Sequence, residues 1–83
     1  MSGKGRTRGA VAERRIRRIT EPQDLRALAH PLRLRLLGAL RLDGPATASA
    51  LARRFEVSSG LTSYHLRALA ERGFVEDAPE HKG

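Results

Sequence analysis

Residues 58–73, SSGLTSYHLRALAERG, place hydroxyl, imidazole, phenol and guanidinium groups close together in the chain. Ser63 and His65 are the residue types of a nucleophile and its base, a pair that activates a hydroxyl in covalent catalysis. Residues two positions apart on a helix point to opposite sides, so the two cannot meet if this segment is helical. No other acid, base or nucleophile converges at a workable spacing, which argues against an enzyme.

The histidines also argue against a metal site. His65 shares a helical face with leucines, which favours a buried structural histidine over a metal ligand. His30 is expected to cap a helix, and His81 stands near acidic residues at a spacing too common to indicate a site. The sequence contains no cysteine and therefore no thiolate ligand. We expect no metal and no other cofactor.

The same segment separates into two faces when it is drawn as a helix, at about 100° per residue. The inward face is predicted to hold Leu61, Thr62, His65, Leu66, Ala68 and Leu69, with Arg72 at its edge. The outward face is predicted to hold Ser59, Gly60, Ser63, Tyr64 and Arg67.

The outward face suits contact with a nucleic acid. Ser and Gly lower helix propensity, so their concentration in the first two turns indicates a surface built to touch something. Small hydroxyls and a glycine let the backbone approach base edges, and hydroxyls can bond several bases or a phosphate. Arg67 has the donors to bond a guanine twice. The alternative is an ordinary solvated helix face.

Basic charge is concentrated at the N-terminus. The 83 residues carry a net charge of +7. Residues 1–20 contain seven basic residues and one acid, so they carry +6 and the rest of the chain carries +1. Segment 1–19 has too few apolar residues to fold alone and is predicted to be a disordered basic arm, followed by a domain at 20–83. The charge predicts a polyanionic partner.

Several basic side chains are candidate phosphate contacts. They are Arg14, Arg15, Arg17 and Arg18 in the arm, Arg53 and Arg54 at the end of a helix, and Lys82. Gly and Arg residues of the arm can follow a phosphate backbone or enter a minor groove. For Arg53 and Arg54 the alternative is stabilisation of the negative end of their own helix.

Capping residues and apolar spacing predict four helices, at about 21–29, 31–42, 47–55 and 58–72. Thr20 is the expected N-cap of the first, with Gln23 completing a capping box. Thr47 is expected to cap the third, and Gly73 to end the fourth. A short strand should follow.

The segment LRLRLLGALRL alternates apolar and basic residues as a strand would, but Leu32, Leu36 and Leu40 also repeat at helical spacing. An Asp-Gly-Pro helix stop after it decides for a helix. The fold class is therefore mainly α, with one core supplied by Leu, Ala and the aromatic residues Phe55, Tyr64 and Phe74.

The compartment is predicted to be the cytoplasm. The absence of cysteine fits a reducing environment. No apolar run approaches the roughly 18 residues of a membrane span. The charged N-terminus has no hydrophobic segment behind it, so a secretory signal is not expected.

The segments LAHPLRLRLLGAL and LARRFEVSSGLTSYHLRALAERGFV carry four recognisable patterns over about residues 25–76. These are Ala-His-Pro-x-Arg, Leu-Ala, Ser-x-His-Leu-x-x-Leu and Gly-Phe-Val. Together they resemble the winged helix-turn-helix of the ArsR family of bacterial transcription regulators. The resemblance implies four helices with a β-wing, and sequence-specific binding of a homodimer to operator DNA.

Three departures limit what the resemblance implies. Glu56 stands where the family usually has a turn glycine, so the turn either avoids positive φ or costs about 1 kcal/mol. The Cys-containing metal motif is absent from the third helix, ATASALARR, so metal sensing is not implied. The second wing strand and the C-terminal helix of family dimers are also missing. We therefore expect a short or incomplete wing and weak dimerisation of this chain, with a homodimer in the full-length protein.

Three functions remain open from the sequence. The first is a regulator that places residues 58–72 in the major groove of double-stranded DNA. The second is a protein-interaction winged helix, in which the same face docks onto another protein and the arm only aids solubility. The third is non-specific coating of RNA or DNA by the arm. Few aromatic residues are available for stacking on single strands, which favours duplex DNA.

Overall fold

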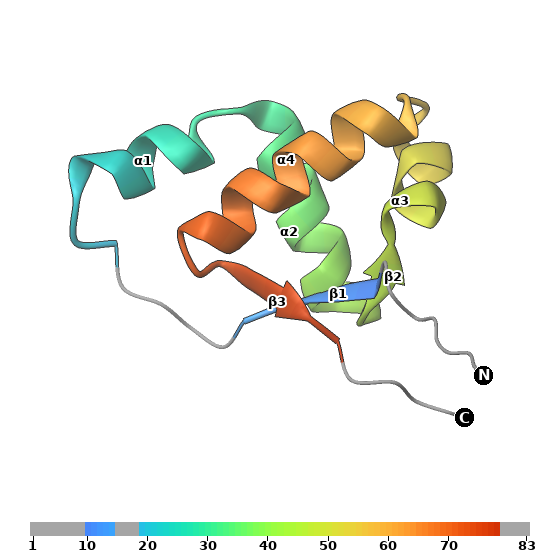
Figure 1. Cartoon of the computed structure of the whole chain (residues 1–83), viewed down its shortest axis with the longest axis horizontal. Coiled ribbons are helices and arrows are strands. Elements are labelled where there is room, and N and C mark those ends of the chain that lie inside the picture. The colour runs from blue at the N-terminus through green and yellow to red at the C-terminus, as the bar shows by residue number, and fades with distance from the viewer. Residues whose placement is uncertain (1–9, 15–18, 79–83) are drawn as a thin grey trace.

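The computed structural model describes residues 10–14 and 19–78. These residues form a mainly helical domain with a small antiparallel sheet, which is a winged helix-turn-helix (Figure 1). The elements in chain order are β1 Ala10–Glu13, α1 Pro22–Leu28, α2 Pro31–Asp43, β2 Ala46–Thr47, α3 Ala48–Phe55, α4 Ser59–Glu71 and β3 Val75–Asp77. None of the described helices is long and apolar enough to cross a membrane.

The four predicted helices are confirmed, with ends that differ by about one residue. The predicted cap of α1 is one position out, because its N-cap is Glu21 and not Thr20. The backbone N–H groups of Thr20 and Glu21 both donate to Asp24 Oδ2, at 3.1 and 3.2 Å. Asp24 therefore takes the role that the sequence suggested for Gln23, because it is the third helical residue once the N-cap is Glu21.

The caps of the other helices agree only in part with those predicted from the sequence. Thr47 Oγ1 accepts from Ala50 N at 3.0 Å, as predicted. Gly73 has φ of 80° and ends α4, also as predicted. His30 occupies the N-cap position of α2, but its side chain makes no capping hydrogen bond. Its ring lies 5.5 Å from the ring of His65 instead, which directs the imidazole toward α4.

The sheet has an unexpected central strand. Its order is β2-β1-β3, and β1 is antiparallel to both neighbours. The prediction that the whole of segment 1–19 is a disordered arm is therefore wrong for residues 10–13, because pairing on both edges satisfies their backbone groups. The rest of the predicted arm, apart from Arg14 and Ile19, lies outside the described residues.

The core lies between the helices and the sheet. Its buried members are Ala27, Leu36, Ala39, Leu40, Leu51, Leu66, Leu69, Phe74 and Val75. Leu36 and Leu40 are buried while Leu34 is half exposed, which is the helical and not the strand-like pattern. Two residues that were predicted to be buried are exposed. Tyr64, predicted to belong to the core, is 60% exposed, and Leu61, predicted to lie on the inward face, is 42% exposed. Leu61 belongs to the first turn of α4, where the helix begins beside an exposed turn.

The turn between α3 and α4 contains a strained residue. Glu56 has φ of 57° and ψ of 46°, the left-handed conformation that favours glycine. We predict that Glu56→Gly raises the free energy of unfolding by about 1 kcal/mol, measured by urea denaturation. Glu56→Ala is the control, because alanine keeps the Cβ responsible for the strain. Equal stabilisation by both substitutions would attribute the effect to the lost charge.

Candidate nucleic-acid interface

The candidate interface is built on α3 and α4, which are joined by the three-residue turn 56–58. Ala52 on α3 is buried, and its small side chain allows α4 to approach closely. Ser58 begins α4, with its Oγ accepting from Leu61 N at 3.0 Å. Helix α4 packs across α2 with its inward face, so its other face is turned away from the body of the domain (Figure 1).

The outward face of α4 has the composition that the helical spacing predicted. Ser59, Gly60, Tyr64 and Arg67 are exposed, and Ser63 is half-buried. A Cβ added at Gly60 would meet nothing within 4 Å, so internal packing does not require glycine there. Arg67 has no hydrogen bond or ion pair within the described part of the chain. Its guanidinium donors are therefore available to a ligand.

A hollow of about 280 Å³ borders this face where α4 meets the sheet. Its lining residues are Val11, Ala48, Ser63, Leu66, Arg67, Ala70 and Asp77. Two of the candidate base-reading residues, Ser63 and Arg67, thus share one surface with β1 and β3. The small sheet borders the outward face and is not remote from it.

The candidate phosphate-contacting arginines differ in whether their side chains already form ion pairs within the described residues. Arg53 is exposed and makes no ion pair among residues 10–14 and 19–78. Arg54 pairs with Asp43 and lies over the ring of Phe55, 5.5 Å from its centroid, so it also braces α3. Arg14 Nε lies 3.8 Å from Glu76 Oε1 at the surface. Arg15, Arg17, Arg18 and Lys82 lie outside the described residues.

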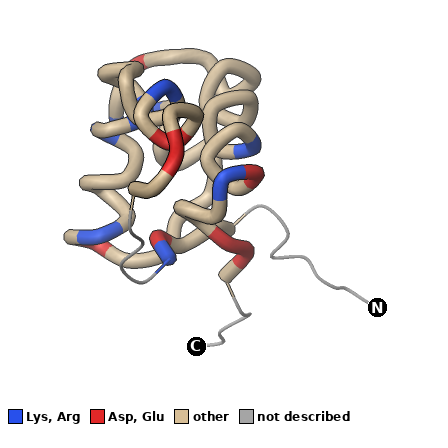
Figure 2. The backbone as a smooth tube through the Cα atoms, turned by 90° about the vertical axis from the view of Figure 1, so that its left-hand side faces the viewer, with Lys and Arg blue, Asp and Glu red and all other residues tan. Residues whose placement is uncertain are grey.

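Residues 10–14 and 19–78 contain nine arginines and eight acidic residues, so the described fold is nearly neutral. Figure 2 shows basic and acidic positions interspersed along the backbone of the described residues. The fold therefore provides little long-range attraction for a polyanion, which leaves that task to the basic N-terminal sequence.

A buried hydrogen bond supports α4 from behind. Arg33 Nε donates to His65 Nδ1 at 2.8 Å, and Arg33 Nη1 donates to the Ala27 carbonyl at 3.2 Å. Arg33 is buried although its sequence position gave no sign of this. The bond requires a neutral His65 with its proton on Nε2. Burial, followed by the nearby charges of Arg33 and His30, lowers the pKa of His65 below its ordinary value of 6.5.

This arrangement predicts a pH-dependent stability. Because the pKa of His65 is lower in the folded chain, the unfolded chain binds the proton more tightly, and stability falls as the pH drops below about 6.5. We predict a lower free energy of unfolding at about pH 5.5 than at about pH 7.5. His65→Asn, whose amide oxygen can still accept from Arg33, should show a flatter dependence. Identical pH dependence in both proteins would contradict this role of His65.

A second, partly buried network connects α1 to the end of α4. Arg72 Nε and Nη2 donate to Asp24 Oδ1 at 3.1 and 2.9 Å, and Nη2 also donates to Glu21 Oε1 at 2.9 Å. Asp24 is completely buried, whereas Glu21 is exposed. Sequence spacing had placed Arg72 only at the edge of the apolar face. The structure instead makes it a bridge between two helices.

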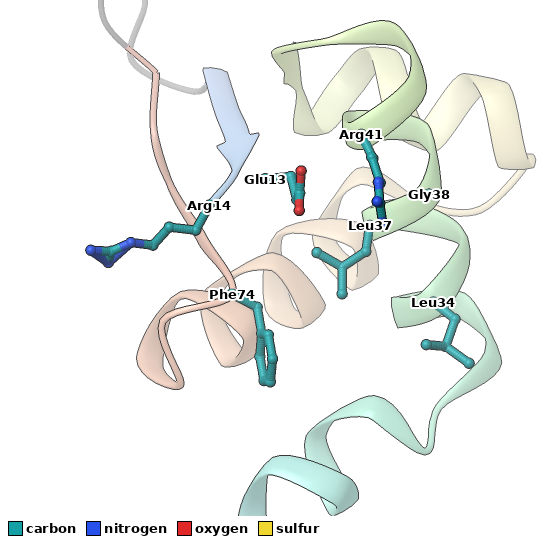
Figure 3. Close-up of a pocket in the computed structure, with 7 residues that line it drawn as sticks. All are labelled: Glu13, Arg14, Leu34, Leu37, Gly38, Arg41 and Phe74. Carbon is teal, nitrogen blue, oxygen red and sulfur yellow. The ribbon is translucent and has the colours of Figure 1, made fainter. Parts of the chain in front are cut away.

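A further hollow, of about 370 Å³, lies between α2 and β1, away from the outward face of α4 (Figure 3). Leu34, Leu37 and Phe74 give it apolar walls, while Glu13 points toward α2 and Arg14 points away. No group of three or more His, Asp or Glu side chains within the described ranges could hold a metal ion.

Comparison with known proteins assigns the central part of the chain. A family model described as a helix-turn-helix domain matches residues 28–78, which is more than half of the sequence and includes α2, α3, α4 and β3. No curated protein and no solved structure matches the chain. The helix-turn-helix is a DNA-binding fold typical of proteins that are not enzymes.

Proposed function

The chain belongs to the helix-turn-helix domain family, and from that premise we propose that it is a bacterial transcriptional regulator that binds double-stranded DNA at specific sequences. In this proposal α4 lies in the major groove, as the second helix of such motifs does. Base-facing roles fall to Ser59, Gly60, Ser63, Tyr64 and Arg67. The basic N-terminal sequence, Arg53 and Arg54 contact phosphates.

The single observation that carries the proposal is the state of Arg67. Its side chain is exposed on the outward face of α4 and has no partner within the described residues. By contrast Arg33, Arg54 and Arg72 are all engaged by other side chains. An unengaged arginine that borders the same hollow as Ser63 fits bidentate recognition of guanine.

The proposal also includes a homodimer that binds a two-fold symmetric operator. A homodimer would place two copies of α4 on two half-sites of an operator. Leu25 and Leu34 are exposed on α1 and α2, and such surface leucines are available for contact between copies.

A nuclear magnetic resonance titration with a short duplex tests where DNA binds. We expect the backbone amides of Gly60, Ser63 and Arg67 to shift on addition of DNA, whereas that of Arg41, in the last turn of α2 beside the apolar hollow, should not. Shifts confined to α1 and α2 would overturn the placement of α4 in the groove. No shift at any residue at low salt would favour the protein-interaction function.

A further inference from the structure

The hollow of about 280 Å³ beside the outward face of α4 has an apolar wall. Val11 of β1, Ala48 of α3, and Leu66 and Ala70 of α4 form this wall. Val11 and Ala48 also pack against the hydrophobic core, and Leu66 belongs to it, so the fold fixes the position of the wall. Covering apolar surface and removing it from water is favourable. The wall therefore favours an apolar group on any molecule that lies against α4.

Three lining residues of this hollow share one side of α4. Ser63 and Arg67 are four positions apart and Ala70 follows three positions later, the spacing of neighbours on a helix surface. Ala70 is exposed, so it extends the outward face toward the C-terminus of α4. The guanidinium of Arg67 has no partner among the described residues. A ligand that reaches this guanidinium therefore also meets the apolar wall.

The lining of the hollow suits one particular base edge. Base pairs present hydrogen-bond donors and acceptors in the major groove, but only one kind of apolar group, the C5-methyl of thymine. The guanine edge that suits Arg67 consists of two acceptors, so it cannot fill an apolar hollow. Asp77 is exposed at the same hollow, and its negative charge repels phosphates. The hollow is therefore suited to a base edge and not to the DNA backbone.

We propose that this hollow receives the methyl group of a thymine next to the guanine that Arg67 reads. The inference rests on the proposed function and adds a second base to the recognised sequence. Arg67 donates hydrogen bonds to the guanine, while Ala70 and the other apolar residues of the wall contact the methyl group. Discrimination at two neighbouring base pairs thus comes from one surface, which α3, α4 and β1 build together.

Uracil tests the methyl group by itself, because it differs from thymine only in lacking the methyl at C5. Fluorescence anisotropy measures affinity for a duplex selected from a random library, with thymine or uracil at each thymine position next to the guanine. We expect the uracil duplex to bind about fourfold more weakly at one of these positions, which is the effect of one buried methyl group. The same replacement at a thymine outside the selected motif is the control and should not change the affinity.

Ala70→Gln tests whether the methyl group lies in this hollow. Ala70 is exposed and glutamine is a good helix former, so the variant should fold. The polar amide replaces part of the apolar wall, so the ratio of thymine to uracil affinities should fall from about four to near one. Ala29→Gln, at the exposed end of α1, is the matched control and should keep the full ratio. An unchanged ratio in Ala70→Gln would overturn the assignment to this hollow.

The remaining outcomes separate this inference from the proposed function. Equal affinities for the thymine and uracil duplexes, or a selected motif with no thymine next to the guanine, would overturn the inference and leave the proposed function intact. Cytosine in place of that thymine would also overturn it, and would indicate that Asp77 accepts a hydrogen bond from the cytosine amino group. Failure of the wild-type chain to select any duplex would overturn both.

Discussion

Asp24→Ala is expected to lower the free energy of unfolding by about 3 kcal/mol. Asp24 is completely buried. Its carboxylate accepts two hydrogen bonds from Arg72 and two from the backbone N–H groups of Thr20 and Glu21, just before α1. Removal of the carboxylate takes the acceptor from four partly buried hydrogen bonds and leaves a cavity at a completely buried position, which is costlier than loss of a surface ion pair. A loss of this size is a large fraction of the stability of a small domain. Urea denaturation of the full chain measures it.

Two matched variants test which acid of this network matters and whether its negative charge is needed. Asp24→Asn keeps the shape and one acceptor oxygen, so it should destabilise less than Asp24→Ala. Glu21→Gln removes the exposed acid that also pairs with Arg72, and should change stability by less than about 0.5 kcal/mol. If Asp24→Ala and Glu21→Gln had similar small effects, the network would not hold α1 to α4.

Arg67→Ala is expected to weaken binding to the preferred duplex by about 1 to 3 kcal/mol and to a scrambled duplex much less. The reason is that a bidentate contact to guanine exists only at the correct base, whereas phosphate contacts are the same on every sequence. The specificity ratio should therefore collapse while general affinity remains. Binding isotherms by fluorescence anisotropy on both duplexes, at matched salt, measure this.

Two further arginine substitutions control for charge. Arg35→Ala removes an exposed arginine from α2, outside the proposed interface, and should leave both affinities nearly unchanged. Arg53→Ala should weaken binding to both duplexes equally, as expected for a phosphate contact. Equal losses for Arg67→Ala on both duplexes would make Arg67 a phosphate contact as well. No loss on either would favour docking of this face onto another protein.

The helices could be predicted because their signals are local. Pro31 in the first turn of α2, the hydroxyl cap at Thr47 and the stop at Gly73 act within one or two turns of their own positions. The same locality explains why the exposed residues of α4 match the helical spacing. Leu61 is the exception, because spacing alone does not show where a helix extends beyond the core.

The strand β1 could not be predicted because its partners are distant in the chain. Ala-Val-Ala-Glu has no strong preference of its own, and its stability comes from pairing with residues 46–47 and 75–77. This changes how the N-terminal sequence must be tested. Deleting residues 1–18 would remove the central strand along with the basic residues, so a loss of binding would not identify phosphate contacts.

The buried charges escaped sequence reasoning for a related reason. Charged side chains are mostly exposed, and only the fold brings Arg72 to Asp24 or Arg33 to His65. Both pairs involve α4, one near its C-terminus and one at its centre. The position of α4 thus depends on contacts that periodicity and capping do not show.

Selection from a random duplex library tests the central claim most directly, that the outward face of α4 reads DNA sequence. We predict that repeated binding and amplification with the wild-type chain enrich one motif containing a guanine. The same selection with Arg67→Ala should lose the preference for that guanine while other positions persist. A pool that stays random with the wild-type chain, or an identical motif with Arg67→Ala, would contradict the account.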